Sequence, residues 1–237
     1  MPGQRLDLAA IESSLREVQR RFAAVDQAHD PLSEEVIQRL LAGYAYLNRL
    51  QAEDVDLLAR GNSAHLLDIN CMVLFGRPNA RRPDRHDGFA ATEQRFYDDS
   101  HLGGVRALMN YLADCMDRSL WRRAAGVYLH ILSEPQLFLE GNHRSAALIM
   151  SHVLLRGGQP PFVLTPANAA DYFDCSSLAK SLRKRAFRTL LDWPRLQRRL
   201  AELLETSSDP VYLAESRSAG FCRQVERVND AASPDPR

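Results

Sequence analysis

Leu137-Phe-Leu-Glu-Gly-Asn-His-Arg144 is the most informative stretch of the chain, because it combines an acidic side chain, a Gly-Asn turn and two cationic or polar side chains. Apolar residues then recur at helical spacing from Ser145 to Arg156, where two glycines form a stop signal. The stretch therefore leads into a helix N-terminus. Backbone N–H groups at such an end lack intrahelical partners and the macrodipole is positive there, which stabilises anions. We expect a phosphate-binding loop.

Helical spacing of apolar residues extends over most of the chain on both sides of this loop. Helices are predicted at residues 11–25, 33–47, 63–75, 101–117, 120–132 and 180–204, with a shorter one after Pro166. Residues 89–97, Phe-Ala-Ala-Thr-Glu-Gln-Arg-Phe-Tyr, include strand-favouring types and precede two aspartates, so a small β-hairpin is predicted there. The predicted fold class is all-α with one short extended element.

The composition indicates a globular protein: 45% of the 237 residues are hydrophobic, and 30 acidic side chains balance 30 lysines and arginines. A neutral chain lacks the basic field of most nucleic-acid-binding domains, so no nucleic-acid partner is expected. Charged residues interrupt the N-terminus and no window has the length of a membrane span. We therefore expect neither a signal peptide nor a membrane partner.

Two further patterns concern cysteines and basic residues. The four cysteines, Cys71, Cys115, Cys175 and Cys222, lack zinc-binding spacing, so we expect reduced and mostly buried thiols in a cytoplasmic protein. Four basic residues crowd the start of the last predicted helix, and a solvated helix face is favoured over a binding patch. These four are Arg183, Lys184, Arg185 and Arg188.

The stretch from Phe138 to Arg144 resembles the signature loop of Fic-domain proteins, His-x-Phe-x-(Asp/Glu)-Gly-Asn-Gly-Arg-x-x-Arg. That family places a β-hairpin flap and two helices before the loop, and a helix closed by Gly and Pro after it. The elements predicted between Phe89 and Pro161 follow the same order. The resemblance divides the chain into four parts. They are an N-terminal helical extension (1–60), a Fic-like core (61–190), a C-terminal helical part (191–229) and a disordered tail (230–237).

Most Fic proteins transfer AMP from ATP to a hydroxyl group of a target protein. Carried over by position, the resemblance implies that Glu140 coordinates Mg²⁺, that Gly141 and Asn142 form an anion nest, and that Arg144 holds a phosphate. The residue types suit these roles, since Mg²⁺ favours carboxylate oxygens and guanidinium donors pair with phosphate oxygens. Mg²⁺ is thus the implied cofactor, and ATP or another nucleotide diphosphate or triphosphate is the implied donor.

Three positions depart from the family pattern. Gln136 occupies the place of the catalytic His, and an amide cannot act as a general base near neutral pH. Loss of a base costs about 10² to 10⁴ in rate, so ordinary AMP transfer is not expected. Gln136 remains a candidate for positioning a substrate. His143 replaces the second Gly of the pattern, and Ala147 replaces the last Arg.

The sequence leaves three interpretations of His143 open. It can be a tolerated side chain on the first turn of the helix, directed to solvent. It can bind ligand, as the Lys does at this place in the death-on-curing (Doc) branch, whose loops end Asn-Lys-Arg-Thr-Ala and which phosphorylates its target. It can also be a displaced general base, because a helix N-terminus disfavours imidazolium and leaves the ring neutral.

The predicted hairpin supplies the last candidate residues, Glu93, Arg95 and Tyr97. The family pairs the edge of its flap with the backbone of a protein target, a form of strand addition, so these residues are candidates for target binding. They are equally compatible with exposed positions on a short hairpin. His130 and His152 lie within helical patterns and are predicted to be structural.

Two functions from different classes remain. One is a divergent Fic-fold protein that binds a nucleotide or another phosphate-bearing ligand, active as a transferase only with an altered base. The other is a catalytically inactive binding or regulatory module of the same fold. The sequence does not indicate the acceptor, the nucleobase of the donor nucleotide, the oligomeric state or the biological process.

Overall fold

The computed structural model describes residues 4–22, 32–78, 87–99, 102–184 and 186–214. Within them the chain forms nine α-helices and a short 3-10 helix, with no strand; two isolated β-bridges join Leu6 to Leu213 and Glu134 to Arg183. The all-α fold class is confirmed. In chain order the helices are α1 (Leu8–Phe22), α2 (Glu34–Ala52), α3 (Ala64–Phe75), α4 (Asp87–Phe96), α5 (Val105–Ala113), α6 (Leu120–Leu132), α7 (Asn142–Arg156), α8 (Ala169–Ser181), α9 (Phe187–Thr206) and η1 (Pro210–Tyr212).

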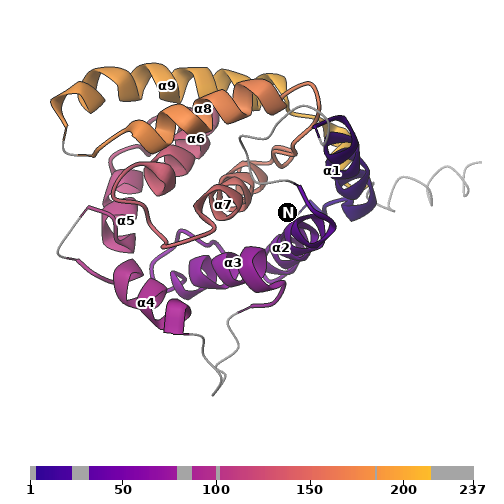
Figure 1. Ribbon diagram of the computed structural model, residues 1–237, viewed down its shortest axis with the longest axis horizontal. Coiled ribbons are helices and arrows are strands. Elements are labelled where there is room, and N and C mark those ends of the chain that lie inside the picture. Colours follow the sequence, from indigo (N-terminus) through magenta and orange to yellow (C-terminus); the bar gives the residue numbers. More distant parts are fainter. Residues whose placement is uncertain (1–3, 23–31, 79–86, 100–101, 185, 215–237) are drawn as a thin grey trace, which may run out of the picture.

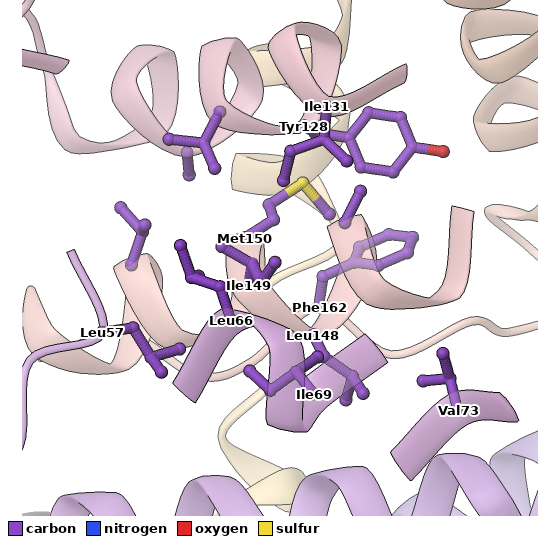
Figure 2. Close-up of a cluster of buried hydrophobic side chains, with 14 of the residues drawn as sticks. Leu57, Leu66, Ile69, Val73, Tyr128, Ile131, Leu148, Ile149, Met150 and Phe162 are labelled. Carbon is purple, nitrogen blue, oxygen red and sulfur yellow. The ribbon is translucent and has the colours of Figure 1, made fainter. Parts of the chain in front are cut away.

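Helix α7 lies at the centre of the fold, with α6 packed on one side and α2 and α3 on the other (Figure 1). Leu148, Ile149 and Met150, on successive faces of α7, are all inaccessible to solvent. Figure 2 shows them in one cluster with side chains of α3 and α6, among them Leu66 and Tyr128. Because α7 is buried along most of its length, packing fixes the position of its N-terminus.

The remaining helices surround this centre. Helices α8 and α9 cover α6, and α5 packs against α6 as well (Figure 1). Helix α1 packs against α2 and η1, and the two ends of the described chain meet there, since the N–H of Asp7 donates to the carbonyl of Tyr212 at 2.9 Å. Buried side chains from α1 to η1 belong to one continuous hydrophobic core.

Local signals begin and end several helices where the sequence predicts. Ser33 caps α2, because its hydroxyl accepts the N–H of Val36 at 3.3 Å. Glu34 and Glu35 lie in the first turn, where their negative charge interacts favourably with the positive end of the helix dipole. Gly76 follows α3 in the left-handed conformation that a helix C-terminus favours. Helix α6 spans the predicted residues without change.

The predicted β-hairpin at residues 89–97 is wrong, because these residues belong to α4 and the turn that follows it. Phe89, Thr92 and Phe96 are buried, and steps of three and four place them on one helix face. A strand would have buried alternate residues instead. The intervening Ala, Glu, Gln and Arg are good helix formers, so periodicity and propensity together outweigh the few strand-favouring types.

Several other sequence predictions concern the periphery. The tail at 230–237, the part of 191–229 beyond residue 214, and Cys222 lie outside the described residues. Cys71, Cys115 and Cys175 are free, buried thiols, as predicted. Of the helices in the described ranges, none has the length and apolar character to cross a bilayer.

The packing of α4 on the central loop is testable through Phe96, which is fully buried and stacks on Phe138 with ring centroids 5.7 Å apart. Phe96→Ala should lower the free energy of unfolding by about 3–5 kcal/mol in denaturant titrations, because it removes a buried ring and leaves a cavity. Leu178→Ala, on the exposed face of α8, is the control and should change stability by about 0.5 kcal/mol or less. Equal losses in the two variants would contradict the burial of α4.

Candidate functional site

The segment between α6 and the loop is anchored by the chain that follows α8. The N–H of Glu134 donates to the carbonyl of Leu182, and the N–H of Lys184 donates to the carbonyl of Glu134, each at 2.8 Å. The Lys184 ammonium donates to the carbonyl of Pro135 at 2.6 Å. These bonds fix Glu134 and Pro135, the residues that lead into the loop.

Asn142, the first residue of α7, closes the loop with its side chain. Its Oδ1 accepts the N–H of Phe138 at 2.9 Å, while its Nδ2 donates to the carbonyl of Phe138 at 2.8 Å and to Oε1 of Gln136 at 3.0 Å. Asn142 is 5% exposed, so these bonds form away from water and leaving them unmade would be costly. Asn142, which was predicted to be part of the anion nest, therefore bonds the inside of the loop with its side chain. Only its backbone belongs to the helix end.

Gln136 also has a structural role in this arrangement. Its Nε2 donates to the carbonyl of Leu132 at 3.1 Å and its Oε1 accepts from Asn142. Both polar atoms of the amide are thus engaged within the protein. Gln136 therefore links the end of α6 to the start of α7.

Asn70 of α3 braces the loop from the opposite side, and the sequence analysis missed it. Its Nδ2 donates to the carbonyl of Glu140 at 2.8 Å and to Oγ of Ser145 at 3.1 Å, and the side chain is fully buried. A signal existed: Asn70 lies between Ile69 and Cys71 on a predicted apolar helix, where a buried amide requires partners.

Gly141 allows the chain to turn from the loop into α7. Its φ of 71° is in the left-handed region that side chains disfavour. A Cβ there would also lie 3.1 Å from Nδ2 of Asn70 and 3.2 Å from Cγ2 of Val73. Both the backbone conformation and the close packing of α3 therefore require glycine at this position.

The N-terminus of α7 has the features of an anion site. The first N–H groups of a helix have no acceptor within the helix, and Gly141 at the cap has no side chain to bond them. Glu140, immediately before, is exposed, and its carboxylate makes no hydrogen bond or ion pair with the described residues. The helix end thus places an exposed acid beside a positive dipole.

The metal prediction at Glu140 rests on one carboxylate. No group of three or more His, Cys, Asp or Glu side chains able to hold a metal is found among the residues that the structure describes. Mg²⁺ is commonly bound by one or two carboxylates together with substrate phosphates and waters, so the donor set at Glu140 fits it when phosphate supplies further oxygens.

Arg144 lies on the first turn of α7 and is half-buried. Its Nη1 donates to the carbonyl of Val73 at 3.0 Å, which ties the guanidinium to the end of α3. A guanidinium has five N–H donors in a fixed plane, and the bond to Val73 orients that plane.

His143 is half-buried and does not project freely into solvent. Its Nδ1 lies 3.3 Å from the hydroxyl of Tyr128 on α6, and that hydroxyl also bonds Ser176 of α8. Nε2 of His143 is buried. The ring is therefore held by a specific contact, which argues against the solvent-directed interpretation. No sequence pattern indicated Tyr128 or Ser176 as part of the site.

Only one of the three residues predicted on the flap lies at the loop. Arg95 donates from Nε to the carbonyl of Gln136 at 3.1 Å. Tyr97 is 46% exposed beside α4, and Glu93 is half-buried on that helix. Strand addition to residues 89–97 is excluded by their helical conformation, so Arg95 is a loop contact and not an edge-strand residue.

The predicted structural histidines are buried. His152 accepts the N–H of Leu57 on Nε2 at 3.1 Å and is fully inaccessible. His130 packs beside Tyr111 and Trp193 at an open cavity of about 850 Å³ between α5, α6 and α9. Burial, aided by the charge of Lys184, lowers the pKa of His130 to about 3.

Lys184 lies at the same cavity, and for this residue the prediction of a solvated basic face is wrong. Its ammonium is half-buried against Pro135, and burial together with the nearby Arg95 guanidinium lowers its pKa to about 7. Arg183 is exposed, as predicted, whereas the side chains of Arg185 and Arg188 lie outside what the structure describes. The cavity wall and the loop thus share Lys184 and Pro135.

Comparison with known proteins adds no assignment to this geometry. No model of a protein family matches the chain, and no curated protein sequence does so either.

The closing role of Asn142 is testable by stability. Asn142→Ala should lower the free energy of unfolding by about 1–3 kcal/mol in denaturant titrations, because the N–H of Phe138 and the amide of Gln136 lose their buried partner. Asn168→Ala is a matched control, since Asn168 is equally buried and likewise bonds the backbone of residues just before its helix. It should destabilise the protein similarly but leave the loop intact. A fully stable Asn142→Ala protein would contradict the assignment.

His130 predicts a dependence of stability on pH. Its pKa is about 3 when folded and about 6.5 when unfolded, so the unfolded chain takes up a proton first as the pH falls below 6.5. Between pH 6.5 and 5 this should cost the folded state about 2 kcal/mol relative to His130→Gln. Denaturant titrations of both proteins across this range measure the difference. Identical pH dependence would show that His130 is readily protonated in the fold.

Proposed function

We propose that this chain is a divergent Fic-fold protein that binds a phosphate-bearing ligand, a nucleotide with Mg²⁺, at the loop from Leu137 to Arg144. The observation that carries the proposal is the coincidence of three features at one helix end. A left-handed glycine opens α7, an exposed Glu140 carboxylate precedes it, and the Arg144 guanidinium occupies its first turn.

The bracing of the loop supports ligand binding at this place. Asn142 and Asn70 hold the backbone from inside, and Gly141 brings the loop against α3. A loop ordered in advance loses little conformational entropy when a ligand binds. Phosphate oxygens would accept the N–H groups of the helix end and the Arg144 donors, while Glu140 would share Mg²⁺ with the phosphates.

Ordinary AMP transfer is not part of the proposal. Gln136 has no protonation step near neutral pH, and both polar atoms of its amide are bonded to the protein. Neither a proton-accepting role nor a role in positioning substrate is supported for Gln136 in this arrangement. The loop is retained for holding phosphate, and the base of the family pattern is absent from its usual position.

A second candidate is a phosphoryl transferase that uses His143 as a displaced general base, and the contact of His143 with Tyr128 favours it. A hydroxyl oxygen would bond to phosphorus as the bond from phosphorus to the leaving oxygen breaks. The leaving group would take the electron pair, and Nε2 of His143 would take the hydroxyl proton. Because Nε2 is buried, the substrate would have to displace the groups that cover it.

Calorimetric titration of the full chain with ATP, ADP and pyrophosphate, with and without Mg²⁺, tests the proposal. Arg144→Ala should weaken binding about tenfold or more, which corresponds to about 1.4 kcal/mol. Glu140→Gln should remove the gain from Mg²⁺ while leaving Mg²⁺-free binding unchanged. Arg156→Ala is the control, because Arg156 lies at the other end of α7 and pairs with Asp54.

Two outcomes decide between the functions. Absence of binding to all three ligands would overturn the proposal and favour an inactive interaction module of this fold. If binding is found, labelled ATP with candidate acceptor proteins separates the remaining cases. Transfer by the wild-type chain that His143→Gln abolishes would favour the second candidate. Transfer seen only in Gln136→His would favour a binding protein that has lost its base.

A further inference from the structure

Three side chains from three helices form a continuous hydrogen-bonded chain beneath the loop. Oγ of Ser176 lies 2.9 Å from the carbonyl of Tyr172, one turn earlier on α8. The Tyr128 hydroxyl lies at hydrogen-bond distance from Ser176 and 3.3 Å from Nδ1 of His143. Tyr128 is fully inaccessible and Ser176 is 1% exposed, so water does not compete for these groups.

The hydrogen bond from the Ser176 hydroxyl to the carbonyl of Tyr172 sets the directions of the other two bonds in this chain. A carbonyl only accepts, so Ser176 must give its single proton to Tyr172. Ser176 can then only accept from Tyr128, which thereby uses the one proton of its hydroxyl. The remaining contact is a hydrogen bond only if Nδ1 of His143 donates to the Tyr128 oxygen.

We infer that Tyr128 and Ser176 hold neutral His143 as the Nδ1–H tautomer, which leaves the lone pair on Nε2. Tyr128 is then a positioning residue: it determines which nitrogen can accept a proton and fixes the plane of the ring. Only the catalytic use of this tautomer rests on the proposed function, since a transferase that used His143 would need the proton-accepting nitrogen at Nε2. The tautomer itself is a property of the protein without nucleotide.

The surroundings of Tyr128 favour the donor role that the chain assigns to it. Burial, with the neighbouring Tyr172, raises the pKa of Tyr128 well above its ordinary value. The phenol therefore stays protonated at neutral pH and has a proton to give to Ser176. A phenolate would instead accept from both neighbours, which would leave the buried charge poorly compensated.

Nitrogen NMR of the full-length protein with ¹⁵N-labelled histidine, recorded at mildly alkaline pH, tests the inference. The chain has seven histidines, so His143→Gln identifies the relevant ring signals. The wild type should show a protonated Nδ1 and an unprotonated Nε2 at His143. Tyr128→Phe should return the ring to the Nε2–H form that imidazole prefers in water, because no acceptor holds the Nδ1 proton.

Ser176→Ala provides a sharper test, because it keeps Tyr128 in place. When the neighbouring Tyr172 hydroxyl is also removed, by Tyr172→Phe in the same protein, the acceptor left to the Tyr128 hydroxyl is Nδ1 of His143. Donation to Nδ1 reverses that bond and moves the ring proton to Nε2. Tyr44→Phe is the matched control: Tyr44 is also buried, and its hydroxyl donates to the carbonyl of Phe162. The tautomer of His143 should not change in this variant.

Each result has one meaning. An Nε2–H signal in the wild type, or an unchanged tautomer in the Ser176→Ala/Tyr172→Phe protein, would overturn the inference even if nucleotide binds. The expected tautomers would support it even if the calorimetric titrations show no binding, in which case the proposed function alone fails. If labelled transfer is found, Tyr128→Phe should lower kcat while leaving KM within about twofold, because substrate binding at Arg144 is untouched.

Discussion

The hydrogen bonds from the side chain of Asn142 are the interaction on which the loop depends. One buried amide joins Phe138 and Gln136, at the start of the loop, to the first residue of α7. The loop can close in this way only because α7 is held in position by helices on both sides (Figure 1). Core packing therefore positions the helix, and the amide then positions the loop against it.

This division of labour explains which polar residues remain able to meet a ligand. Asn142, Asn70 and Gln136 face inward, and most of their bonding capacity is used to satisfy buried backbone and each other. Glu140 is exposed, and Arg144 lies on the first turn of α7, where it donates to the carbonyl of Val73 on α3. The side that holds the loop together is distinct from the side on which we propose that phosphate binds.

Helix positions were predictable where periodicity was long and the ends carried capping signals, as for α3, α6 and α7. The segment at residues 89–97 was not, because its few aromatic and β-branched residues were given more weight than the spacing of Phe89, Thr92 and Phe96, which is helical. The same spacing brings Arg95 to the carbonyl of Gln136. Recognising the helical periodicity would have predicted both the helix and, approximately, the side of the helix on which Arg95 lies.

The sequence by itself determined the helical class, the presence of a turn at Gly141 and the residue types at the start of α7, because these depend on neighbours in the chain. Only the tertiary structure decided what those side chains do. Asn70 and Tyr128 reach the loop from α3 and α6, and Ser176 of α8 reaches Tyr128, across separations that no local pattern encodes. Hydrogen-bond direction is likewise set by the whole chain of partners, so the protonated nitrogen of His143 follows from packing and not from its own position in the sequence.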